Sequence, residues 1–169
     1  MNVVLVGYRG TGKSTVAGLV AQALGYEVIN LDAEIVRRAG RSIPDLVAER
    51  GWEGFRDLEE EVCRSCAQEP GRVVDCGGGV VEREANFEVL RNAGRVFWLT
   101  ATVATIVERI QGDDQRPSLT GTKSFTEEVS EVLERREPLY RKLAHVAVPT
   151  DGRTPAELAA EIVERVTPG

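Results

Sequence analysis

Aromatic residues are scarce in this sequence: phenylalanine, tyrosine and tryptophan together make up 5% of its 169 residues. A surface that binds nucleic acid usually needs such rings for base stacking and an excess of positive charge for the phosphates. The chain instead has 21 lysines and arginines against 27 aspartates and glutamates, which gives a net charge of −6. These two shortages argue against a nucleic-acid partner.

Cysteine and long apolar runs are also lacking. Three cysteines are too few for a disulfide framework. No apolar run approaches the roughly 20 residues that span a bilayer, and the chain enters its first apolar run without the charged segment of a secretory signal. The sequence therefore predicts a cytoplasmic protein with no membrane partner. Its length and its 42% apolar content predict one folded domain, 1–169, and we expect a monomer.

Short apolar runs alternate with longer amphipathic stretches along the chain. The runs are continuous and rich in β-branched residues, as strands buried on both faces should be. They lie at Val3–Val6, Val28–Leu31, Val73–Cys76, Val96–Leu99 and Val146–Val148. The first amphipathic stretch ends at Gly25, and the last begins with Thr154 as its N-cap and Pro155 in its first turn. This alternation predicts an α/β fold with a parallel sheet covered by helices on both faces.

A phosphate-binding motif follows the first apolar run. Gly7–Ser14 match G-x-x-x-x-G-K-[ST], with a predicted strand before the loop and a predicted helix after it. Glycines allow backbone N–H groups to face phosphate oxygens, the lysine reaches the β- and γ-phosphates, and the serine hydroxyl binds Mg²⁺. We expect ATP to be bound by Gly10, Thr11, Gly12, Lys13, Ser14 and Thr15, with Lys13 also catalytic and Ser14 a Mg²⁺ ligand. A glycine-rich turn that binds no nucleotide is the alternative.

A polar stretch at 112–124 is rich in glycine, proline, serine and threonine. Long loops of this kind in compact domains are often lids, although a simple connection is the alternative. The chain has no N-K-x-D motif for reading guanine. Its size and its lid therefore favour a small-molecule kinase, in which closure of the lid excludes water.

Two aspartates lie where predicted strands end, and in parallel sheets ligands bind beyond those ends. Asp32 follows the second run, and it could accept a proton from a substrate hydroxyl or orient that hydroxyl. The alternative is that Asp32 caps a helix over 33–39. Asp75, at the end of the third run, is a candidate for binding Mg²⁺, and its alternative is a residue that forms a turn.

A triple glycine and three arginines complete the candidate site. Gly77–Gly79 follow the third strand and would let a ligand approach the backbone, with a simple turn as the alternative. Arg116 lies in the lid, where it could neutralise charge on the phosphoryl group in transfer. Arg56 and Arg136 suit a substrate carboxylate, because guanidinium pairs with carboxylate through two parallel hydrogen bonds. For each arginine, an exposed helix position is the alternative.

Together these motifs resemble the shikimate kinase family, and the resemblance runs nearly end to end. It rests on the phosphate loop, Leu31-Asp32, Gly40-Arg41-Ser42-Ile43, Phe55-Arg56 with Glu59-Glu60, the triple glycine, Arg116-Pro117, and Arg136 before Pro138-Leu139-Tyr140. It implies a nucleoside-monophosphate-kinase-like fold, with five parallel strands in the order 2-3-1-4-5. It also implies transfer of the γ-phosphate of ATP to the 3-hydroxyl of shikimate, with Mg²⁺.

The resemblance also implies roles for individual residues. Asp32 would hold the shikimate hydroxyls and act as the base or orient the reacting hydroxyl, within a substrate-binding region at about 32–60. The shikimate carboxylate would be bound by Arg56 and Arg136, supported by Phe55 and Glu59, with Gly78 and Gly79 lining the pocket. Arg116 would contact the phosphates, and the adenine would lie between Arg109, Arg153 and Pro155.

One position departs from the family pattern. Where the family usually has an acid two residues before Asp32, this chain has Asn30. In the implied strand order the third strand neighbours the first, so Asp75 would lie beside the phosphate loop. We therefore hypothesise that Asp75 supplies the missing carboxylate for Mg²⁺.

Other features are interpreted as packing, and two other functions stay open. Cys63 and Cys66 have no second pair to complete a zinc site, His145 has no obvious partner, and Trp52 and Trp98 are expected to be packing residues. The alternative functions are a related kinase for a gluconate-like acid or a nucleoside monophosphate, and a non-catalytic nucleotide-binding module.

Overall fold

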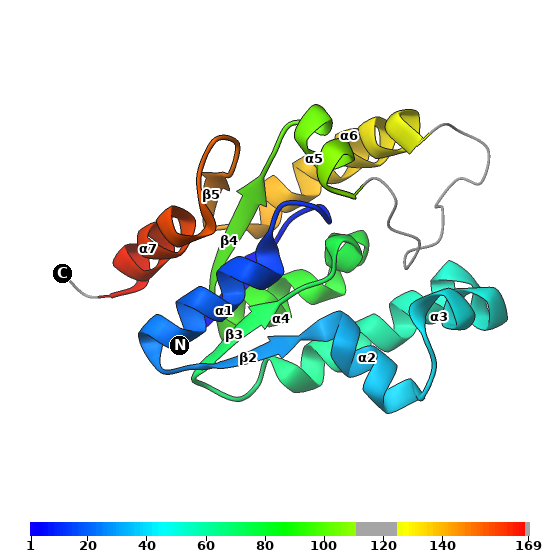
Figure 1. Ribbon diagram of the computed structural model, residues 1–169. Coiled ribbons are helices and arrows are strands. Elements are labelled where there is room, and N and C mark those ends of the chain that lie inside the picture. Colours follow the sequence, from blue (N-terminus) through cyan, green and yellow to red (C-terminus); the bar gives the residue numbers. More distant parts are fainter. Residues whose placement is uncertain (111–124, 168–169) are drawn as a thin grey trace.

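The computed structural model describes residues 1–110 and 125–167 and contains one parallel sheet (Figure 1). The strands follow the order β2-β3-β1-β4-β5, which confirms the order expected from the resemblance. They are β1 (Asn2–Val6), β2 (Glu27–Asn30), β3 (Arg72–Asp75), β4 (Gly94–Thr100) and β5 (Val146–Pro149).

Helices connect the strands and cover the sheet. They are α1 (Lys13–Leu24), α2 (Leu31–Ala39), α3 (Ile43–Cys66), the 3₁₀ helix η1 (Gly78–Glu82), α4 (Ala85–Ala93), α5 (Val103–Ile110), α6 (Phe125–Leu143) and α7 (Pro155–Val166). The predicted helix ends are confirmed: Gly25 ends α1 in a left-handed conformation (φ 72°), and the Thr154 side chain caps α7 by accepting a hydrogen bond of 3.2 Å from the Glu157 N–H.

Alternate side chains of the central strands point into two separate cores. On one face, Val3 and Leu5 pack with residues of α1 and α7. On the other face, Val4 and Val6 pack with residues of α2, α3, α4 and α6. Since β1 is buried on both faces, its apolar run is continuous, as its sequence predicted.

The two edge strands differ from this prediction. Two of the four residues of β2 are exposed, with Val28 39% exposed, and in β5 only Val148 is fully buried. An edge strand has a neighbour on one side only, so the helices cover it less completely than the centre of the sheet. The predicted ends of the second and third runs were also one residue too late, because Leu31 begins α2 and Cys76 follows the end of β3.

Helix α3 contains a break that turns its second half. Gly51 has φ 72° and ψ 175°, which an L side chain rarely adopts, and helical geometry resumes after it. The second half carries Phe55, Arg56 and Glu59, all of which are buried. Within the described residues, no helix is both long and apolar enough to cross a membrane.

Candidate active site

The loop between β1 and α1 has the backbone that its glycines predict. Gly7, Gly10 and Gly12 all have positive φ angles, of 147°, 84° and 87°. Lys13 is buried, and its Nζ donates hydrogen bonds to the Gly7 and Tyr8 carbonyls, at 2.7 and 3.1 Å. The lysine therefore lies folded back over the loop, where its charge is available to a bound phosphate.

The ends of β2 and β3 meet the first turn of α1. Asn30 and Asp75 are directly paired residues of these two strands. Asp75 accepts a hydrogen bond of 2.7 Å from Ser14 Oγ, and Asn30 Nδ2 donates one of 3.0 Å to the same oxygen, Oδ2. The expectation that Asp75 lies beside the phosphate loop is thus confirmed.

Asp75 is a buried carboxylate in a polar setting. Burial raises its pKa above the ordinary value, although the hydrogen bonds from Ser14 and Asn30 and the charge of Lys13 act in the opposite direction. A cation placed next to this group would favour its charged form.

Asp32 is half-buried and does not cap its helix, so the capping alternative is wrong. The residue that caps α2 is Asn30, whose Oδ1 accepts a hydrogen bond of 2.8 Å from the Ala33 N–H. Asp32 is the second residue of α2, and its side chain lies against the triple glycine: a Cβ atom on Gly77 would lie 2.6 Å from Asp32 Oδ1. Its carboxylate is therefore placed by the start of the helix rather than engaged in capping it.

One cleft unites the predicted residues of the phosphate loop and the strand ends. It has a volume of about 280 Å³. Its lining includes Gly10, Gly12, Lys13, Ser14, Thr15, Asn30, Asp32, Asp75 and Gly78. A phosphate at the loop and a hydroxyl at Asp32 would therefore share a single space.

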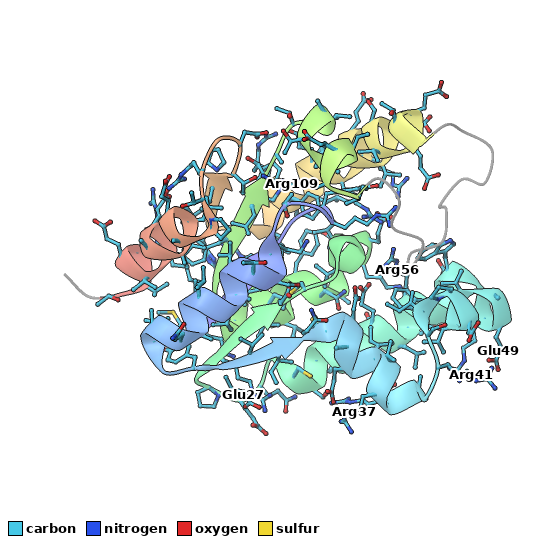
Figure 2. The ribbon with its side chains drawn as sticks, in the orientation of Figure 1. Glu27, Arg37, Arg41, Glu49, Arg56 and Arg109 are labelled. Carbon is cyan, nitrogen blue, oxygen red and sulfur yellow. The ribbon has the colours of Figure 1, made fainter. Side chains whose placement is uncertain are left out.

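Arg56 extends from the second half of α3 (Figure 2). It packs against Gly79 of the triple glycine. Its Nη1 donates a hydrogen bond of 2.9 Å to Glu59 Oε1, and both side chains are buried. The guanidinium also lies 5.2 Å from the ring centre of Trp52 and 5.3 Å from that of Phe55. Trp52 is therefore a packing residue that contacts a predicted site arginine, a role that the sequence did not indicate.

Arg136 approaches the same glycines from α6. It is buried, a Cβ atom on Gly78 would lie 3.4 Å from its Nη1, and its Nε has no hydrogen-bond partner among the described residues. Its Nη2 lies 3.5 Å from Glu82 Oε2, and its guanidinium lies 5.7 Å from the ring centre of Tyr8. A buried cation with an unsatisfied donor suits an anionic ligand.

Glu82, a neighbour of Arg136, is a residue that sequence reasoning missed. It forms ion pairs with Arg135 and Arg136. Burial opposes the ionisation of Glu82, but the hydrogen bond from Arg135 and the positive charges of Arg136 and Arg56 outweigh it, so its pKa lies below the ordinary value. Glu82 is the last residue of η1, and no local sequence signal indicates this partnership, because Arg135 lies 53 residues further along the chain.

The predicted adenine-side residues lie around the end of β5. Arg109, on α5, donates a hydrogen bond of 3.0 Å to the Gly10 carbonyl and lies beside the phosphate loop (Figure 2). It also reaches Thr150 Oγ1 at 3.5 Å, and the Arg153 N–H bonds to the Thr150 carbonyl at 3.2 Å. The Arg153 guanidinium instead forms an ion pair of 2.8 Å with Glu161 of α7. Thr150, which is fully buried, thus contacts both Arg109 and Arg153, two residues that lie far apart in the sequence.

Several remaining predictions can be compared with the structure. Arg116 and the lid, 112–124, lie outside the described residues.

Cys63 and Cys66 are buried free thiols in a hydrophobic core, as expected for packing. Trp98 stacks on Tyr140, whose hydroxyl donates to the Gly78 carbonyl. The expectation that His145 has no obvious partner is wrong, because its Nδ1 accepts a hydrogen bond of 2.9 Å from the Val96 N–H.

Comparisons with known proteins show which family the chain resembles. A sequence model of a family described as shikimate kinase matches residues 9–167. The shikimate kinase of Nitratidesulfovibrio vulgaris is 42% identical over 98% of this chain and 93% of its own. That of Rhodopirellula baltica is 41% identical over 95% of this chain and 87% of its own.

A solved structure extends the likeness to three dimensions. The shikimate kinase from Acinetobacter baumannii in complex with shikimate is 33% identical to this chain and has a TM-score of 0.93, with coverage of 98% of this chain and 92% of its own. The match in sequence and the match in fold span nearly the same residues. The chain therefore belongs to the shikimate kinase family.

Proposed function

We propose that this chain transfers the γ-phosphate of ATP to the 3-hydroxyl of shikimate, within the cleft between the phosphate loop and the triple glycine. Membership of the family makes the chain an ATP-dependent phosphotransferase. The observation that supports the site assignment most strongly is the shared cleft, which is lined by Lys13, Ser14, Asp32 and Asp75.

The donor side is the loop between β1 and α1. Backbone N–H groups from Gly10 to Thr15 would contact the β- and γ-phosphates, and Lys13 would exchange its bonds to the Gly7 and Tyr8 carbonyls for bonds to phosphate oxygens. Arg109 lies close enough to the loop to border the nucleotide. Arg153 and Pro155 would complete the adenine site, and Arg116 would approach the phosphates from the lid.

The acceptor side is the pair of buried arginines. Arg56 and Arg136 reach the triple glycine from α3 and α6, and each has a carboxylate partner, Glu59 or Glu82. A substrate carboxylate would add charge-assisted hydrogen bonds to both guanidinium groups. Gly78 and Gly79 carry no side chain, which lets the two guanidinium groups lie close to the backbone at this end of the cleft.

Ser14 and Asp75 fit a Mg²⁺ ion that arrives with ATP. Mg²⁺ prefers oxygen ligands and is commonly held by one or two carboxylates together with substrate phosphates. Ser14 Oγ and Asp75 Oδ2 lie 2.7 Å apart beside the phosphate loop. Among the described residues no group of three histidine, cysteine, aspartate or glutamate side chains could hold a metal by itself. When bound, the ion would neutralise charge on the phosphates.

Asp32 would orient the shikimate 3-hydroxyl and accept its proton. The hydroxyl oxygen forms the new bond to the γ-phosphorus, the bond from that phosphorus to the β-γ bridging oxygen breaks, and ADP leaves with the electron pair. The small volume of the cleft brings the hydroxyl and the γ-phosphate together, which supplies much of the rate enhancement in phosphoryl transfer.

Release of ADP by the purified protein with MgATP tests this function. Shikimate should stimulate ADP release strongly, whereas gluconate and AMP should leave it near the rate without an acceptor. Stimulation by gluconate or AMP instead would favour a related kinase. ATP binding without turnover on any acceptor would favour a non-catalytic nucleotide-binding module.

A further inference from the structure

We infer that Asn30 is a positioning residue that holds two carboxylates of the site, Asp75 and Asp32, through the two ends of one amide. The inference rests on the proposed function, in which Asp75 binds Mg²⁺ and Asp32 orients the acceptor hydroxyl and accepts its proton. It adds a third residue, whose role is to position these two carboxylates.

The nitrogen end of the amide fixes Asp75. Asn30 and Asp75 are the last residues of the neighbouring strands β2 and β3, and they are paired in register. Asn30 Nδ2 donates a hydrogen bond of 3.0 Å to Asp75 Oδ2. The same oxygen accepts a hydrogen bond of 2.7 Å from Ser14 Oγ. Two donors on one oxygen restrict rotation of the carboxylate and keep it against the first turn of α1.

The oxygen end of the amide fixes the start of α2. Asn30 Oδ1 accepts a hydrogen bond of 2.8 Å from the Ala33 N–H and so caps the helix. Asp32 lies in this first turn, between the capping residue and the N–H that it binds. A rotation of the Asn30 side chain would therefore disturb both carboxylates together.

An aspartate at position 30 could perform only one of these two tasks. Its carboxylate could cap α2, because aspartate is a good N-cap residue. It has no N–H to donate, however, and it would place an oxygen about 3 Å from Asp75 Oδ2, where two carboxylates repel each other unless a cation lies between them. The amide at 30 is thus required by the carboxylate at 75, and the pair should work equally well with its two members exchanged.

Four proteins test the inference: the wild type, Asn30→Asp, Asp75→Asn, and the exchange variant Asn30→Asp/Asp75→Asn. Asn92→Asp, at an exposed position of α4, adds the same charge elsewhere and serves as the control. The first measurement is the thermal midpoint at pH 8 in EDTA and in Mg²⁺, without nucleotide. In EDTA, the thermal midpoint of Asn30→Asp should be about 3 °C or more below that of the wild type, and Mg²⁺ should restore part of this difference. The thermal midpoint of the exchange variant should lie near that of the wild type.

The second measurement is the affinity for ADP by calorimetry, with and without Mg²⁺. Asp75→Asn should reduce the Mg²⁺-dependent gain in ADP affinity by about tenfold or more. The exchange variant should regain most of it, because one carboxylate and one amide are again paired at the two strand ends. The control should behave like the wild type in both measurements.

Two results would overturn the inference. One is an Asn30→Asp protein as stable in EDTA as the wild type, since the amide would then not be holding Asp75. The other is an exchange variant that gains no more ADP affinity from Mg²⁺ than Asp75→Asn does. Neither measurement uses shikimate, so failure of the proposed function would appear separately, as a wild type that does not phosphorylate shikimate.

Discussion

The guanidinium of Arg56 lies directly against the backbone of Gly79. A Cβ atom on Gly79 would lie 2.3 Å from both terminal nitrogens of the arginine, well inside any permitted contact. Arg56 cannot easily move away, because Glu59 and the rings of Trp52 and Phe55 hold it from the other sides. The glycine therefore sets the position of an arginine that is proposed to bind the substrate.

Gly79→Ala should accordingly displace Arg56 and weaken the binding of shikimate. We expect the KM for shikimate to rise about tenfold or more, since small displacements of positioning groups are costly, while the KM for ATP changes little. Gly18→Ala in α1 is the matched control, because a Cβ there would meet nothing within 4 Å. Steady-state kinetics of both variants would give the KM values for shikimate and for ATP. An unchanged KM for shikimate in Gly79→Ala would contradict the assigned position of Arg56.

Lys13→Met should abolish most of the activity. The lysine is buried against the loop carbonyls, and no other lysine in the described part of the chain reaches them, so its charge on the phosphates cannot be replaced. We expect kcat to fall by about 100-fold or more. Lys142→Met, at an exposed position of α6, should retain nearly full activity. Comparable losses in the two variants would argue against a specific role for Lys13.

Arg136→Lys should raise the KM for shikimate with little change in the KM for ATP. A lysine keeps the charge but cannot form two parallel hydrogen bonds with a carboxylate, and we expect a rise of about 10- to 100-fold. Arg135→Lys is the control, because Arg135 is exposed and its ion pair with Glu82 can be kept by a lysine. The prediction fails if both variants show the same KM for shikimate.

Protonation of His145 should destabilise the junction of β4 and β5. Burial and the charges of Arg91 and Arg95 lower its pKa, and its neutral Nδ1 accepts the Val96 N–H. The unfolded chain therefore binds more protons than the folded chain below about pH 6.5, and the free energy of unfolding falls as the pH falls through that value.

Urea unfolding between pH 7 and pH 5.5 measures this effect. His145 is the single histidine of the chain, so its contribution can be isolated. His145→Asn keeps a side-chain acceptor but does not titrate, and its stability should change less over this range. Parallel pH profiles for the wild type and the variant would show that the histidine is not responsible.

Much of the fold could be predicted from the sequence, because its signals are local or belong to recognisable motifs. The continuous apolar runs identified the strands, and Gly25 and Thr154 identified helix ends. The strand order came from the family resemblance, and it correctly placed Asp75 beside the phosphate loop.

The contacts that complete the site could not be predicted in the same way. Glu82 meets Arg135 and Arg136, and Thr150 meets Arg109, only because distant segments pack together. The cap of α2 could not be predicted for a similar reason: Asn30 and Asp32 are both good capping residues, and only the end of β2 decides between them.

The most direct test of the account compares kcat/KM for shikimate with that for its methyl ester. The ester keeps the ring and the hydroxyls but lacks the carboxylate charge that Arg56 and Arg136 are proposed to bind. We predict a loss of about 100-fold or more with the ester in the wild type, and a much smaller difference between the two acceptors in Arg136→Lys. Equal kcat/KM values for shikimate and its ester in the wild type would contradict the claim that the two buried arginines select the acceptor.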